Sequence, residues 1–184
     1  MKPSVSVLLF LFAASSCALA KDPEPAGTDL EVFAPSQTWT FLKGTEFAPG
    51  GEGSFTVHAG DNESIGVLKY DFTGGGVYVA GKTKVEIPEG YTELRFQVKS
   101  DLDQRVGIRL FDESGQAHQT LLDYTDPGNW QELRLDLTAK APSTFGGAKD
   151  GVIHYPIGQI WLLVEKKGQT DPGEVSFKGV RAYK

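Results

Sequence analysis

The stretch ELRFQVKSDLDQRVGIRLFDESG, residues 93–115, decides the fold. Apolar side chains occupy every second position over residues 94–98 and again over residues 106–110, with polar or small residues between them. Residues 112–115, Asp-Glu-Ser-Gly, then supply turn chemistry. Alternation with a period of two is the pattern of a half-buried strand, so the stretch predicts two β-strands and the start of a turn.

The same period recurs elsewhere in the chain. It is clearest over residues 68–72, 133–137 and 160–164, and turn sequences with Pro and Gly at 125–129 and 170–173 precede further strands. No segment shows the sustained i, i+3, i+4, i+7 apolar spacing of an amphipathic helix. We therefore predict an all-β fold of short antiparallel strands, either a β-sandwich or a barrel.

The first twenty residues have the pattern of a secretory signal peptide, with Lys2, an apolar run and small residues before Lys21. A second interpretation uses Cys17, whose surroundings loosely match a bacterial lipobox and would carry a lipid anchor. Both interpretations predict export, to the periplasm, the exterior or, for a lipoprotein, the outer surface. We expect residues 1–20 to be the signal peptide, residues 21–34 a flexible linker and residues 35–184 one domain.

The charge of the chain limits its partners. Removal of Lys2 with the signal peptide leaves 17 basic against 24 acidic residues, a net charge of −7. Such a charge argues against binding to nucleic acid or heparin. No other apolar run approaches membrane-spanning length, and we expect a monomer.

Sequence motifs for catalysis are missing. The chain has no Gly-x-Ser-x-Gly elbow and no His-Glu-x-x-His, and its three histidines, at 58, 118 and 154, lack metal-ligand spacing. We therefore predict that the protein is not an enzyme. Two acids facing each other in a groove would revive a small glycan-cleaving enzyme.

The order of short motifs along the chain resembles the galactose-binding-like jelly rolls that serve as carbohydrate-binding modules and as accessory domains of secreted glycoside hydrolases. The motifs are WTF (39–41), EFAPGGEGS (46–54), LKYDF (68–72), ELRFQVKSD (93–101), RLFDESGQ (109–116), NWQELRL (129–135), YPIGQIW (155–161) and GEVSFKGV (173–180). The resemblance implies a sandwich of two packed sheets that binds a polysaccharide or glycan on a concave sheet or on loops. The same β-sandwich without sugar binding, acting as a structural or protein-interaction module, is the alternative.

Many members of this family hold a structural calcium near the first and last strands. Here Lys178 stands in the closing strand where an acid would help. Glu46 and Glu52 are the remaining candidate ligands, since hard cations prefer oxygen donors.

Sugar binding uses aromatic faces and planar polar side chains, so the candidates are residues out of phase with the core. Trp161 alternates with Ile160 and Leu162, and Tyr78 lies between Val77 and Val79. The candidates on the predicted outward face are Tyr78, Gln97, Arg109 and Trp161, with Tyr124 and His118 as candidates beside loops. Trp161 could instead belong to the core of a strand buried on both sides.

Three consecutive glycines, Gly74–Gly76, come shortly before Tyr78. Because β-forming residues follow them, we predict a turn or bulge between adjacent strands rather than a phosphate loop, which would lead into a helix. Whether they also clear space beside Tyr78 is open at this stage.

Overall fold

The computed structural model describes residues 27–60, 63–168 and 170–184, which form strands joined by turns and loops, with no helix. The strands are β1 (Thr28–Asp29), β2 (Thr40–Leu42), β3 (Glu52–His58), β4 (Ile65–Asp71), β5 (Tyr78–Ile87), β6 (Glu93–Ser100), β7 (Gln104–Phe111), β8 (Gln116–Tyr124), β9 (Gln131–Asp136), β10 (Ser143–Gly146), β11 (Ile157–Glu165) and β12 (Gly173–Tyr183). The predicted signal peptide, with Cys17, lies outside the described residues. Within those residues nothing resembles a bilayer-spanning helix.

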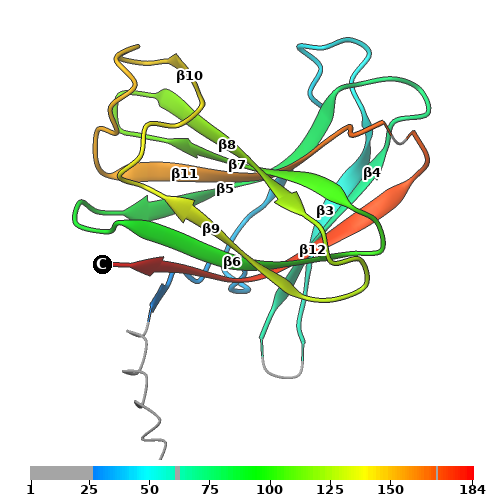
Figure 1. The fold of residues 1–184 in the computed structure, drawn as a ribbon, viewed down its shortest axis with the longest axis horizontal. Helices are drawn as coiled ribbons and strands as arrows, with labels where there is room; N and C mark the ends of the chain where they lie inside the picture. Colours follow the sequence, from blue (N-terminus) through cyan, green and yellow to red (C-terminus); the bar gives the residue numbers. More distant parts are fainter. Residues whose placement is uncertain (1–26, 61–62, 169) are drawn as a thin grey trace, which may run out of the picture.

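The strands form two antiparallel sheets that pack face to face (Figure 1). Sheet A has the order β3-β4-β12-β6-β9, with β1 added beside β12, and sheet B has the order β10-β8-β7-β11-β5-β2. The predicted all-β antiparallel sandwich, a jelly roll of two packed sheets, is confirmed, and the barrel alternative is not adopted.

The core lies between the sheets and follows the alternation of the sequence. From sheet B, β7 contributes Val106, Ile108 and Leu110, and each of these is almost fully buried. From sheet A, β6 contributes Leu94 and Phe96 to the same cluster. Burying one such side chain contributes about 1.5–3 kcal/mol, so the inward face of each strand fixes its orientation.

β6 and β7 are neighbours in sequence but not in space. β6 pairs with β12 and β9 in sheet A, whereas β7 pairs with β11 and β8 in sheet B. The short segment 101–103 therefore crosses from one sheet to the other instead of closing a hairpin. This crossing separates residues that local alternation alone would place together.

The folded domain begins before the predicted boundary at residue 35. β1 pairs with β12, and Val32 and Phe33 are buried in the core. Trp39 stacks between Phe33 and Phe55, with ring centroids 5.5 and 4.2 Å apart, and its Nε1 donates to the Val32 carbonyl at 2.8 Å. Residues 27–34 thus belong to the sandwich, which corrects the linker predicted over residues 21–34.

Gly74–Gly76 form a turn between β4 of sheet A and β5 of sheet B, so they join opposite sheets rather than adjacent strands. Gly75 and Gly76 have φ values of 116° and 94°, a region that glycine tolerates. A Cβ on Gly76 would lie 2.4 Å from the Gly51 nitrogen, whereas one on Gly74 would meet nothing within 4 Å. The turn therefore packs its backbone against the segment 49–51.

Candidate functional site

The outer face of sheet B carries a continuous row of polar, charged and aromatic side chains. Strand register places Trp161 of β11 opposite Arg109 of β7 and Lys82 of β5. The row continues to Gln119 of β8 beyond Arg109, and to Thr40 of β2 beyond Lys82. Because opposed residues share one face of a sheet, a single extended ligand lying across the strands would meet all five side chains.

Arg109 is the most buried side chain of this row. It is only 6% exposed, and its guanidinium carbon lies 5.1, 5.1 and 4.8 Å from the ring centroids of Tyr78, Phe145 and Trp161. Nε donates to Gln119 Oε1 at 2.7 Å and Nη1 to the Tyr78 hydroxyl at 3.4 Å. A guanidinium has five N–H donors, so three of those on Arg109 have no protein acceptor among the described residues.

Tyr78 connects Arg109 to a loop. Its hydroxyl donates to Glu46 Oε1, and Glu46 lies in the 43–51 segment that the glycine turn supports. Burial raises the pKa of Tyr78, the hydrogen bond to Glu46 raises it further, and Arg109 acts in the opposite direction. The phenol is therefore neutral at physiological pH, and its hydroxyl holds the Glu46 carboxylate beside the cation.

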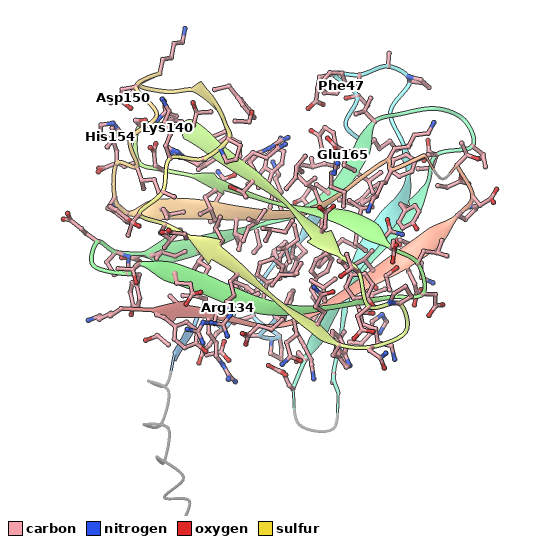
Figure 2. The ribbon with its side chains drawn as sticks, in the orientation of Figure 1. Phe47, Arg134, Lys140, Asp150, His154 and Glu165 are labelled. Carbon is pink, nitrogen blue, oxygen red and sulfur yellow. The ribbon has the colours of Figure 1, made fainter. Side chains whose placement is uncertain are left out.

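A hollow of about 370 Å³ opens above Arg109, and we call it the Arg109 hollow. Phe47, which is 52% exposed, and Phe145, which is 45% exposed, supply apolar surface to its lining. Figure 2 shows Phe47 on a loop at the top of the view and Glu165 lower in the view, and both line this hollow. The hollow is lined by Glu46, Phe47, Val77, Tyr78, Arg109, Gln119, Ser143, Phe145, Leu163 and Glu165.

A second hollow of about 470 Å³ lies toward β2 and β5, and we call it the lysine hollow. It is lined by Ser36, Gln37, Thr38, Thr40, Lys82, Thr83, Lys84 and Gln159. Trp161 stands between the two hollows, because Arg109 flanks it on β7 and Lys82 on β5. Its Nε1 donates to Gln159 Oε1 at 3.3 Å, and Lys82 Nζ lies 5.7 Å from its ring centroid.

The sequence candidates separate in the structure. Tyr78, Arg109 and Trp161 share the outer face of sheet B, as expected. Gln97 does not join them, because β6 lies in sheet A, where Gln97 pairs with Lys178 and Glu132. The expectation that Gln97 lies on one face with Tyr78, Arg109 and Trp161 is therefore wrong.

Tyr124 and His118 are buried rather than available beside loops. The Tyr124 hydroxyl donates to the carbonyls of Ser100 and Asn129 at 2.9 and 2.8 Å and also contacts that of Asp126. His118 is 3% exposed, and its Nε2 lies 3.0 Å from Asp112 Oδ2. Both side chains are therefore placed to hold the scaffold, and neither faces the row around Arg109.

The two candidate calcium ligands already have protein partners. Glu46 accepts from Tyr78, and Glu52 forms an ion pair with Lys43 at 2.6 Å. In the described ranges no group of three or more His, Cys, Asp or Glu side chains has the arrangement of a metal site.

The sequence analysis missed Phe47, Phe145, Gln119 and the two lysines. Phe47 and Phe145 lie outside the strongly alternating segments, which offer no sign of their direction. Gln119 was missed because the sequence analysis did not recognise that its neighbour His118 faces inward. The strand register reveals the contact of Gln119 with Arg109.

Comparisons with known proteins place this fold. In the search of solved structures, the chain aligns with a family 11 carbohydrate-binding module from Clostridium thermocellum, in complex with a β-1,3-1,4-mixed-linked tetrasaccharide, at a TM-score of 0.65 over 87% of this chain and 97% of that one, with 11% identity. The chain has the fold of a carbohydrate-binding module.

Two further structures support the same assignment of fold. The family 11 module of a cellulosomal cellulase from the same organism matches at a TM-score of 0.59 with 13% identity, over 88% of this chain and 96% of that one. An agarase matches at 0.55 with 13% identity, over 86% of this chain and 24% of its own length. No family model and no curated protein matches the sequence.

Proposed function

We propose that this protein is an exported, non-catalytic carbohydrate-binding protein that holds a polysaccharide or glycan on the outer face of sheet B. The observation that carries the proposal is Arg109, buried among three aromatic rings at the base of a hollow with N–H donors left over. Sugar hydroxyls accept from such donors, and exposed rings such as Phe145 offer apolar surface to sugar C–H groups. The signal-peptide pattern supports export.

Replacement of aromatic residues tests the proposal. We expect Trp161→Ala and Phe145→Ala each to weaken glycan binding about 30-fold or more, since aromatic anchors in binding sites contribute roughly 2 kcal/mol or more. Trp130→Ala is the matched control, because Trp130 packs under Lys178 of β12 in sheet A. Calorimetric titration with glycans chosen from a broad array and insoluble-polysaccharide pull-downs supplies the measurement.

Two outcomes would contradict the proposal. One is failure of the unaltered protein to bind any glycan on the array or any insoluble polysaccharide, which favours the structural or protein-interaction alternative. The other is an equal loss of affinity in Trp130→Ala, which would move the site away from sheet B.

A small glycan-cleaving enzyme is the second candidate, because Glu46 and Glu165 line the same hollow. Two carboxyl groups across a groove are the arrangement that glycoside hydrolysis requires. Release of reducing ends from a bound glycan, lost in both Glu46→Gln and Glu165→Gln, would establish catalysis. We expect no such release from the purified protein.

A further inference from the structure

The two hollows on the outer face of sheet B differ in charge. The Arg109 hollow combines one cation with Glu46 and Glu165. The lysine hollow contains Lys82 and Lys84, and its other lining residues are neutral and polar. The second hollow is therefore basic in a chain whose formal net charge is −6.

The basic residues of this face also differ from most of those elsewhere in their pairing. Lys43, Arg105 and Arg181, for example, each lie within 4.0 Å of a carboxylate oxygen. Among the described residues no carboxylate oxygen lies within 4.0 Å of Lys82, Lys84 or Arg109. Lys43 and Arg105, by contrast, each form ion pairs with nearby carboxylates.

The acids on the same face of β5 and β11 make no ion pair with the lysines of this hollow. Glu86 follows Lys84 by two positions on the same face of β5, a separation of about 7 Å along the strand. It makes no ion pair with either lysine within 4.0 Å in the described part of the chain. Glu165, two rows away, is already 3.3 Å from Arg105.

Lys82 and Lys84 are placed to act on one ligand group. They point to the same side of β5, about 7 Å apart, and both line the one hollow of about 470 Å³. Lys82 is half-buried beside Trp161 and is itself a member of the row that continues to Arg109. A glycan lying along that row would bring its next residue over the lysine pair.

We propose that the lysine hollow is a subsite for an anionic group, a carboxylate or a sulfate, and that the ligand of this face is an acidic polysaccharide. The inference rests on the proposed function, because it names the class of glycan that the same face takes. Charge complementarity supports the inference. The lysines of this hollow make no ion pair with any residue that the structure describes, and the hollow adjoins a row whose side chains suit sugar hydroxyls and sugar rings.

The experiment compares three oligosaccharide probes of equal length by calorimetric titration: a neutral mixed-linkage β-glucan, a carboxylated oligogalacturonate and a sulfated galactan. Each is titrated into the full chain, a Lys82→Gln/Lys84→Gln variant and a Lys99→Gln/Lys184→Gln control. The control removes the same charge from β6 and from the residue after β12, both in sheet A. Titrations run at about 50 mM and about 500 mM NaCl, because high salt screens exposed charge pairs.

We expect one acidic probe to bind more tightly than the neutral one at low salt. Loss of both lysines should weaken that binding about 2- to 30-fold, since each exposed charge pair is worth up to about 5-fold. Binding of the neutral probe should weaken by a smaller factor than binding of the acidic probe, because it loses a contact with Lys82 but no charge pair. High salt should remove the acidic preference. The probe that responds distinguishes a carboxylate from a sulfate.

Two results would overturn the inference. Neutral binding equal to or tighter than both acidic probes overturns it and leaves the proposed function standing. An equal loss in the Lys99→Gln/Lys184→Gln control assigns the preference to overall charge and also overturns it. Failure of all three probes, and of the wider glycan array, overturns the proposed function itself.

Discussion

Arg109 illustrates how a cationic side chain can be buried without a carboxylate within 4.0 Å among the described residues. Removing a guanidinium from water is costly unless the protein replaces its hydration. Here Gln119 and Tyr78 accept two hydrogen bonds, and three rings face the cation at 4.8–5.1 Å. Cation–π contacts contribute about 0.5–2 kcal/mol each, so the aromatic residues stabilise the cation as well as shaping the hollow.

Asp112 is the residue at which pH should act on stability. Its buried carboxylate accepts from His118 Nε2, the Ser114 hydroxyl and the Gln116 and His154 backbone N–H groups, at 2.7–3.1 Å. Burial acts to raise the pKa of Asp112, but these donors outweigh it and hold the value at about 2.

Because the pKa of folded Asp112 lies below its ordinary value of 3.8, its stabilisation is present above about pH 4 and disappears as the pH falls toward 2. A shift of this size corresponds to about 2 kcal/mol. We expect Asp112→Asn to lower the free energy of unfolding by about that amount at pH 7 and to flatten its fall between pH 4 and 2. Urea unfolding at several pH values measures this, and parallel pH curves for the two proteins would contradict it.

The turn between β4 and β5 should affect glycan affinity although its glycines, Gly74–Gly76, do not line the Arg109 hollow. Gly76 has a φ of 94°, and its backbone lies against Gly51 in the segment that carries Glu46. We expect Gly76→Ala to shift this segment, to lower glycan affinity several-fold and to cost about 1–3 kcal/mol of stability. Titration with a bound glycan and thermal unfolding measure the two effects.

Gly74→Ala is the matched control in the same turn. A Cβ there meets nothing within 4 Å, so this variant should behave like the unaltered protein. Equal behaviour of the two variants would show that the turn does not support the site.

Strand alternation predicted the direction of several side chains of the candidate site, and strand pairing decided which of them lie together. The side-chain period of two gave the outward direction of Trp161, Arg109 and Tyr78 without any knowledge of partners. Gln97 has the same outward direction within its strand but belongs to sheet A. Pairing depends on contacts between distant segments, which a local period does not contain, and Lys82 became visible only through its register with Trp161.

We expect added calcium to have little effect on the thermal stability of the protein. Glu46 and Glu52, the candidate ligands, are engaged by Tyr78 and Lys43. A structural ion at 100 times its dissociation constant would add about 2.7 kcal/mol, which raises Tm by several degrees. Scanning calorimetry with added calcium and with EDTA should show a difference below about 1 °C. A rise of several degrees with calcium would contradict this expectation.

The fold class followed from the sequence because alternation, turn chemistry and the absence of helical periodicity agreed. The start of the domain did not follow from the sequence, since residues 27–34 contain no alternating run and lie between Pro25 and Pro35. β1 has only two residues, and it is held by its partner β12 rather than by its own pattern. Short edge strands of this kind are visible only once the rest of the sheet is in place.

The pairing of β1 with β12 also sets how the domain presents itself. Thr28 lies opposite Ala182, so the first described residues and the C-terminal residues run side by side in sheet A (Figure 1). The row that contains Arg109 and Trp161 lies on the outer face of sheet B. A fusion partner, a lipid or a solid support attached next to β1 or after β12 would therefore lie on the side of sheet A, opposite the outer face of sheet B. The proposed binding face would then point away from the attachment and remain open to a polysaccharide surface.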